Sequence, residues 1–566
     1  MLRREFLLTP LAAASLAGQT STWRPVYMAR HGIVATGHYM TAMAGFRMLE
    51  QGGNAVDAAA AAALASTVVE PSRAGIGGHA AILLYLAREK RIVYINGNGW
   101  APQAATPERF ANGGIPMDGP LAPVVPGAVD GLLTAAGKYG KLKPPALLAP
   151  AIDLAEHGFG TSENMQNVFQ RNASRLDPHP STVAFWKAGG EWPRMGQHIV
   201  QKDLAATFRR IAQSGRDGFY RGVTARRIAG FLEAQGGILT EADLAGFTAE
   251  ETEPLHIRYK DFDLYAAPPT SYAHVMLESL KILEGLDLRG MGHNSPAYLH
   301  HVAEAMKISF ADRDTWISDP RFPHRADVRR LLTDAYAARQ RARIRPDSVL
   351  NPNEAHGDPL NLTASAYPDW IEGLTTYCGV IDREGNMASV TSTISSDFGN
   401  AQYVDGEGGG FFLNNWMSLF RVEPDHPNCI APGKRPRHGL SPCLALRGGE
   451  AVMAFGTPGG DTIPQSQLQF FLNTAEFGMN LQQAVEQPYA LTSAFVASRT
   501  PHGIGNRLAV SERIENQVRA GLEKRGHRVT THPAFGVGGV KAVARDPRGI
   551  LLGGAAPATD SYIAGW

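Results

Sequence analysis

The chain has 566 residues, of which 44% are hydrophobic and 19% charged. Such a composition can fill a large apolar core, and it differs from that of disordered chains, which are poorer in hydrophobic residues. The 54 basic residues nearly balance the 53 acidic ones, and no run of five or six like charges forms a basic arm or an acidic tail. We therefore expect a globular protein that has no nucleic-acid partner.

The first 17 residues have the pattern of an export signal. Arg3 and Arg4 precede an apolar stretch from Leu7 to Leu16 that Pro10 interrupts, and the small residues Ser15 and Ala17 flank Leu16. The stretch is too short to span a bilayer as a helix, and the paired arginines resemble a twin-arginine signal. We expect cleavage after Ala17 and export to the bacterial periplasm or beyond. A frayed N-terminal helix is the alternative, and no later stretch is long and apolar enough to anchor the chain in a membrane.

The next strong signals lie between residues 52 and 95. A Gly52-Gly53-Asn54 turn can cap a helix over Ala55–Val69, and the alanine-rich middle of this helix suits close packing on a sheet. Two short apolar runs, residues 80–86 and 91–95, surround a charged tip and are typical of a β-hairpin.

The rest of the chain shows no linker and no repeat, so one continuous α+β domain is the simplest organisation. Helical patterns dominate residues 144–350. Beyond Thr375, short strands and Gly-rich turns alternate with a helix near Gln465–Phe477.

The three cysteines and 18 histidines give no metal-binding pattern. Cys378, Cys429 and Cys443 lack ligand spacing, and they allow at most one disulfide. No His-Glu-x-x-His or paired Cys-x-x-Cys occurs. We expect neither a metal nor another cofactor.

A hairpin in the last third of the chain carries the main chemical hypothesis. Strands over residues 375–381 and 387–393 flank a polar, Gly-containing turn. If the residues beside the turn pair with each other, the antiparallel register places Thr375 opposite Thr393, about 5 Å apart. Threonine is common in strands, so this hairpin alone indicates no function.

Four motifs, of which this hairpin is one, occur in an order that is typical of a known enzyme family. Together they resemble the γ-glutamyltransferase family of N-terminal-nucleophile hydrolases, and the match extends from about Val34 to the C-terminus. The motifs are Gly52-Gly53-Asn54-Ala55-Val56-Asp57-Ala58, Glu70-Pro71 with Gly75-Ile76-Gly77-Gly78, Thr375-Thr376 with its hairpin, and Gly456-Thr457-Pro458-Gly459-Gly460. The resemblance implies a four-layer αββα sandwich.

The resemblance also implies a mechanism. Thr375 is expected to attack the carbonyl of Leu374, so that the chain is cut into a large subunit, residues 18–374, and a small subunit, residues 375–566. An N-terminal threonine then supplies its own base, an α-amine with a pKa near 7.7–8.0. Thr393 matches the position whose hydroxyl contacts the nucleophile, and the backbone N–H groups of Gly459 and Gly460 match the oxyanion donors.

The positions that bind the glutamyl group of the substrate in this family carry different residues in this chain. An arginine that holds the substrate's α-carboxylate is replaced by Asn98, and a glutamine and an acidic residue after the Asn414-Asn415 pair are replaced by Trp416 and Leu419. The remaining changes are Ser395 in place of an asparagine and His438-Gly439 in place of paired serines. Each lost charge-assisted contact is worth roughly 1.5–3 kcal/mol. Trp416 and His438 are expected either to line a different acyl pocket or to pack in the core.

Three functions remain open on these residues. The leading hypothesis is an exported, self-cleaving amide hydrolase that acts through an acyl-enzyme on a small-molecule amide with an acyl group other than γ-glutamyl, as in the acylase and amidohydrolase branch of the family. The second is true glutathione hydrolysis or γ-glutamyl transfer, with Arg73 or Arg437 supplying the carboxylate contact. The third is a non-catalytic protein that keeps the fold.

Overall fold

The structure is a computed structural model that describes residues 22–323, 327–352 and 375–566. The expected signal peptide and Leu374 lie outside these residues. Within the described part of the chain, no helix has the combined length and apolar character that crossing a bilayer requires.

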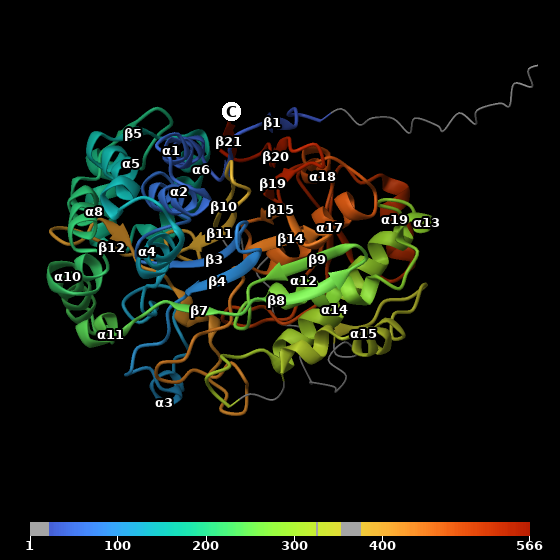
Figure 1. Cartoon of the computed structure of the whole chain (residues 1–566). Coiled ribbons are helices and arrows are strands. Elements are labelled where there is room, and N and C mark those ends of the chain that lie inside the picture. Colours follow the sequence, from blue (N-terminus) through green and yellow to red (C-terminus); the bar gives the residue numbers. More distant parts are fainter. Residues whose placement is uncertain (1–21, 324–326, 353–374) are drawn as a thin grey trace, which may run out of the picture.

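Two seven-stranded antiparallel sheets lie at the centre of the molecule, and strands β10, β11, β15 and β19 pack one sheet against the other (Figure 1). In order, the first sheet contains β21 (Tyr562–Gly565), β2 (Ile33–Thr36), β10 (Thr376–Ile381), β11 (Met387–Thr393), β3 (His79–Leu86), β4 (Arg91–Gly97) and β7 (Glu250–Thr252). The second contains β1 (Tyr27–Ala29), β20 (Leu551–Ala555), β19 (Lys541–Arg545), β15 (Glu450–Gly456), β14 (Cys443–Arg447), β9 (Phe262–Ala266) and β8 (Leu255–Tyr259).

Helices cover the outer face of each sheet, which confirms the expected four-layer αββα sandwich (Figure 1). The first sheet is covered by α1 (Tyr39–Glu50), α2 (Ala55–Val69) and α4 (Ala128–Tyr139), with α5 (Pro144–His157) and α8 (Lys202–Ser214) behind them. The second is covered by α12 (Ala273–Leu283), α17 (Ile463–Ala475) and α18 (Leu481–Glu486), with α14 (Pro296–Trp316), α15 (Asp334–Arg341) and α19 (Asn516–Lys524) packed outside.

Shorter elements connect these layers. The remaining α-helices are α3 (Pro107–Phe110), α6 (Glu163–Leu176), α7 (Pro180–Trp186), α9 (Asp217–Tyr220), α10 (Gly222–Glu233), α11 (Glu241–Gly246) and α13 (Leu288–Met291). The 3-10 helices are η1 (Ala188–Gly190), η2 (Val328–Leu332), η3 (Trp416–Leu419) and η4 (Gly460–Thr462). The small sheets pair β5 (Phe159–Gly160) with β6 (His198–Ile199), β12 (Tyr403–Val404) with β13 (Phe411–Phe412), and β16 (Ala490–Thr492) with β17 (Leu508–Ser511) and β18 (Val529–His532).

Helix α2 connects the core to the β10–β11 hairpin. Its predicted bounds are confirmed, and all of its residues are buried. Asn54 and Asp57 form a capping box, in which each side chain accepts a hydrogen bond from the other's backbone N–H. The N–H of Ala55 donates to Asp382 in the β10–β11 turn at 2.9 Å. The helix start therefore fixes the turn end of the hairpin, and its alanine methyl groups let it lie close to β10 and β11.

Two expectations need adjustment. The helix predicted near Gln465–Phe477 begins at Ile463, because Pro464 is well tolerated in a first helical turn. Within the region of predominantly helical patterns, β8 and β9 form a hairpin that extends the second sheet. Along β8 the buried and exposed side chains alternate, which is the strand signature that a helical interpretation overlooks.

Strands from both expected subunits interleave in both sheets. Residues before Leu374 supply β1 to β9, and residues from Thr375 onward supply β10 to β21. In the first sheet β10 and β11 lie between β2 and β3, with backbone pairing on both sides. Neither segment therefore builds a complete sheet alone.

The three cysteines are free thiols buried in the structure, so the one disulfide that their number allows is not formed.

Candidate functional site

The predicted pair of hydroxyls meets at the start of β10. The β10–β11 register follows the prediction, with Ile381 opposite Met387. Thr375 donates a hydrogen bond from Oγ1 to Oγ1 of Thr393 at 3.3 Å, and the N–H of Ser395 donates to the same acceptor at 2.8 Å. Both threonines are buried. The Thr393 oxygen thus orients the Thr375 hydroxyl from a position that the backbone holds.

The next residue, Thr376, points to the opposite face of β10, as alternation along a strand requires. Its hydroxyl donates to Oε2 of Glu70 at 2.9 Å. Burial raises the pKa of this Glu70 carboxyl, whereas burial lowers the pKa of the neighbouring Lys541 to about 7. A Cβ on Gly37 would lie 2.4 Å from the Thr376 oxygen, so this close approach needs glycine. These contacts hold the start of β10 in place on the face opposite to Thr375.

Across the first sheet, the row that starts at Thr375 and Thr393 continues to Asn98. His79 on β3 is the register partner of Thr393, and the pairing of Ala80 with Gly97 places Asn98 beside His79. At about 4.8 Å between neighbouring strands, Asn98 lies about 10 Å from Thr393. The Asn98 amide donates to Asn96 at 2.7 Å, so it stabilises the end of β4.

Three stacked rings lie beside this row. His79 stacks on Trp416 with ring centroids 3.8 Å apart, and Trp416 stacks on His438 at 4.8 Å. All three side chains are buried. Burial lowers the pKa of His438 to about 3, and it lowers that of His79 well below the usual value, so both imidazoles are neutral at physiological pH. Trp416 and His438 are thus packed core residues that also border the site.

The two predicted oxyanion glycines lie in the loop between β15 and α17. Gly459 and Gly460 have positive φ angles, 134° and 56°. Among the described residues, neither N–H has a hydrogen-bond acceptor. Gly439 packs closely against this loop. A Cβ at this position would lie only 2.9 Å from the Gly460 carbonyl oxygen. Two adjacent backbone donors are therefore available to a developing negative charge.

Among the predicted substrate-binding positions, Ser395 is the one whose contacts the structure describes most fully. Its φ is 91°, so the chain turns sharply after Thr393. Its hydroxyl accepts a hydrogen bond from Nη2 of Arg499 at 2.9 Å, and Nη1 of Arg499 donates to the Ser396 hydroxyl. Arg499 could not be predicted from the sequence because it lies 104 residues beyond Ser395, outside every recognisable motif.

The two arginines that could bind the carboxylate of a glutamyl substrate differ in the contacts that their guanidinium groups already make. Arg437 is bonded to Asp314 at 2.8 Å and to the Arg313 carbonyl at 2.8 Å, so its guanidinium is occupied. Among the residues that the structure describes, the Arg73 guanidinium has a single ion-pair contact, at 4.0 Å, with the Glu70 carboxylate. Together with Gly459, Arg73 lines a cavity of about 540 Å³.

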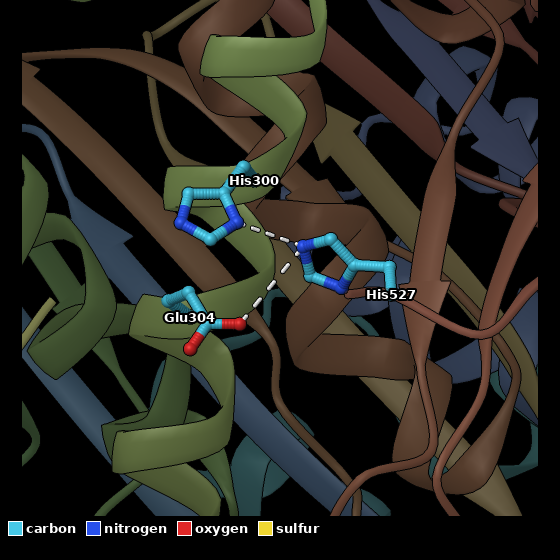
Figure 2. A group of neighbouring side chains, drawn as sticks. All are labelled: His300, Glu304 and His527. Carbon is cyan, nitrogen blue, oxygen red and sulfur yellow. Dashed lines mark hydrogen bonds and ion pairs between the residues drawn. The ribbon is translucent and has the colours of Figure 1, made fainter. Parts of the chain in front are cut away.

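A second polar cluster connects α14 to the segment that follows α19. Figure 2 shows His300, Glu304 and His527 close enough together to hold a metal ion. Nδ1 of His300 and Nε2 of His527 are 2.8 Å apart, and Glu304 accepts a hydrogen bond from the Lys307 ammonium at 2.7 Å. Because the ammonium already occupies the carboxylate where a cation would bind, these contacts describe a hydrogen-bonded structural cluster.

Comparison with known proteins identifies the family. The sequence model described as Gamma-glutamyltranspeptidase matches residues 41–566. The chain is 34% identical over 559 residues to the Acylase ACY 1 proenzyme of Pseudomonas sp. (strain SE83), covering 96% of this chain and 95% of that protein. It is 32% identical over 540 residues to the Glutathione hydrolase proenzyme of Bacillus subtilis (strain 168), covering 93% and 89%.

Solved structures agree with this assignment. The cephalosporin acylase from Bacillus halodurans superposes with a TM-score of 0.86 at 30% identity, covering 97% of this chain and 98% of that one. The gamma-glutamyltranspeptidase of Helicobacter pylori gives a TM-score of 0.55 at 32% identity, covering 58% and 95%. The chain therefore belongs to the gamma-glutamyltranspeptidase family of hydrolases.

Proposed function

We propose that this protein is a self-cleaving amide hydrolase in which Thr375 is the nucleophile and the acyl group differs from γ-glutamyl. The observation that carries the proposal is the hydrogen bond between the hydroxyls of Thr375 and Thr393. The N–H groups of Gly459 and Gly460, which have no acceptor in the described part of the chain, support it.

The first step is self-cleavage. Oγ1 of Thr375 attacks the carbonyl carbon of Leu374, the C–N bond breaks, and the nitrogen takes up a proton to become the Thr375 α-amine. Water then hydrolyses the resulting ester, which frees the Leu374 carboxylate and restores the Thr375 hydroxyl. The new α-amine, with a pKa near 7.7–8.0, serves as the base in later turnovers.

Turnover repeats the same chemistry on a substrate amide. The α-amine removes the hydroxyl proton while Oγ1 attacks the acyl carbon, and the N–H groups of Gly459 and Gly460 stabilise the oxyanion. The amine leaves with the proton, and an ester links the acyl group to Thr375. Water, activated by the same α-amine, hydrolyses this ester.

The changed binding positions favour a non-glutamyl substrate. Asn98 is bonded to Asn96, and Trp416 and His438 are stacked rings, so none of the three offers a charge to a glutamyl group. The relatives named as acylases agree with this preference, whereas those named as glutathione hydrolases represent the alternative. Arg73, which lines the cavity beside Gly459, is the residue through which the alternative would operate.

Two measurements test the proposal. Denaturing electrophoresis of the wild type should show two fragments, one that ends at Leu374 and one that begins at Thr375. Thr375→Ala should remain one chain. A wild type that stays intact under conditions where it is folded would refute self-cleavage. In a panel of γ-glutamyl anilide, glutathione, oxamate and glutaryl amides, rapid turnover of only the first two would establish the glutathione-hydrolase alternative.

We further propose that the protein is exported, with residues 1–17 as a twin-arginine signal. The support is the Arg3-Arg4 pair before the apolar stretch. Cell fractionation of the wild type and of an Arg3→Lys/Arg4→Lys variant tests this proposal. Equal amounts of both in the periplasmic fraction would contradict the twin-arginine route.

A further inference from the structure

Lys541 is a buried lysine at the start of β19, close to the predicted oxyanion donors in the fold. Its side chain is fully buried, and its Nζ has no hydrogen-bond partner in the described part of the chain. Its backbone pairs with that of Gly456, the last residue of β15 before the glycine loop (residues 457–460), which contains both donors. A buried ammonium is costly unless an opposite charge lies near it.

Glu70, at the C-terminal end of α2, supplies that opposite charge. Its carboxylate attracts the Lys541 ammonium, although burial raises the pKa of Glu70 and lowers that of Lys541 by disfavouring each charge. Oε2 of Glu70 accepts the Thr376 hydroxyl at 2.9 Å, whereas Oε1 has no hydrogen-bond partner among the described residues. The two groups therefore support each other's charge.

A second cation competes for the same carboxylate. Nη1 of Arg73 lies 4.0 Å from Oε1 of Glu70, and its charge also acts against that of Lys541. The Asp560 carboxylate faces the cluster as well and repels Glu70. The direction in which the Glu70 carboxylate points thus depends on the balance between Lys541 and Arg73.

The pair connects two parts of the proposed catalytic machinery that lie on different sheets. On the first sheet, Glu70 is bonded to Thr376, the neighbour of Thr375 in the chain. On the second, Lys541 pairs with Gly456 at the start of the glycine loop, and β10 packs against both β15 and β19. A shift of the Glu70 carboxylate would therefore change where Thr375 lies relative to the N–H donors of the glycine loop.

We propose that Lys541 is a positioning residue of the hydrolase: its ammonium holds the Glu70 carboxylate on the Thr376 hydroxyl and so sets the position of Thr375 relative to the glycine loop. The proposal rests on the hydrolase function above and adds a residue to it. Without the ammonium, the Arg73 guanidinium attracts Glu70 unopposed, and the carboxylate is expected to turn toward Arg73 and away from Thr376.

The kinetic test uses Lys541→Met, which removes the charge and keeps an unbranched side chain. On the panel substrate that the wild type hydrolyses fastest, kcat should fall about 10- to 100-fold, because a displacement of about 1 Å can cost about 100-fold. KM should change less than about twofold, because Lys541 is not among the described residues that line the cavity beside Gly459. Lys307→Met, the control, removes another buried ammonium, bonded to Glu304 at 2.7 Å, and should retain wild-type kcat.

A second substitution distinguishes lost position from lost folding. In the Lys541→Met background, Glu70→Gln removes the unbalanced charge, and the new amide oxygen can still accept the Thr376 hydroxyl. Replacing both partners of a buried ion pair costs far less than removing one of them, so kcat of the double variant should return to within about threefold of the wild type. A double variant that is no faster than Lys541→Met would overturn the proposal.

A crystal structure of the uncut Thr375→Ala protein with Lys541→Met tests the contact without any turnover. The Glu70 carboxylate should bond to Arg73 and lie more than about 3.5 Å from the Thr376 hydroxyl; an unchanged bond to Thr376 would overturn the proposal. If Glu70 turns as expected but the wild type neither cleaves itself nor hydrolyses any substrate, the hydrolase function fails, and the positioning role fails with it. If the wild type is active and Lys541→Met keeps the kcat of Lys307→Met, the positioning role is wrong and the hydrolase function stands.

Discussion

Replacing Thr393 by valine tests the mechanism at the contact on which it depends. Valine keeps the branched shape but removes the oxygen that accepts hydrogen bonds from Thr375 at 3.3 Å and from the N–H of Ser395 at 2.8 Å. Losing a neutral hydrogen bond of about 0.5–1.5 kcal/mol should slow turnover about 2- to 10-fold, if the bond orients the attacking oxygen. The buried N–H of Ser395 also loses its acceptor, which should cost about 1–3 kcal/mol of folding free energy.

The assay has three readouts. Denaturing electrophoresis follows the uncut fraction against time, anilide hydrolysis gives kcat/KM, and urea unfolding in the uncut Thr375→Ala background gives the stability. Thr393→Ser keeps the oxygen and is the matched control, expected within about twofold of the wild type in rate. Wild-type rates for Thr393→Val, or equal losses in the serine and valine variants, would show that the hydroxyl has no orienting role.

Two further predictions concern the loop that contains Gly459 and Gly460, the predicted oxyanion donors, and the buried imidazoles. Gly459→Ala should reduce kcat at least about tenfold, because the φ of 134° is unfavourable for alanine and the new Cβ would lie 2.1 Å from Oγ1 of Thr462. Gly449→Ala, which also has a positive φ but no atom within 4 Å of the new Cβ, is the control and should retain wild-type kcat. For pH, burial lowers the pKa of His438 to about 3. The unfolded chain therefore binds the extra proton first, and stability should fall by about 1.4 kcal/mol per pH unit for this histidine as the pH decreases below about 6.5. Urea unfolding of the uncut Thr375→Ala protein at pH 7 and pH 5 should show a smaller pH effect when His438→Gln is added; an unchanged effect would contradict a neutral buried imidazole.

The local parts of the fold and site were predictable because their determinants are close in sequence. The cap at Asn54, the length of α2 and the β10–β11 register all follow from residues within one element or one hairpin. The pairing of Thr375 with Thr393 follows in the same way, since a tight turn fixes which residues face each other.

The parts that were missed depend on distant contacts. Arg499 reaches Ser395 across 104 residues, and His79 meets Trp416 and His438 from three separate segments. No periodicity or spacing predicts such contacts, because they form only when the two sheets pack together. The β8–β9 hairpin is different, since its alternating pattern was visible in the sequence.

The proposed cut after Leu374 would separate strands that interleave in both sheets, and it would therefore change the thermodynamics of unfolding. Before cleavage, β10 and β11 find β2 and β3 as parts of one molecule, and folding is unimolecular. After cleavage, the same sheet is the interface of two chains, so its unfolding releases two molecules and the midpoint depends on protein concentration. Refolding then needs an encounter that the intact chain never required, since the covalent connection no longer keeps the two segments at a high effective concentration. Self-cleavage therefore makes refolding depend on whether the chain has already been cut. The uncut chain can refold alone after denaturation, whereas the mature enzyme can refold only when its two fragments associate again.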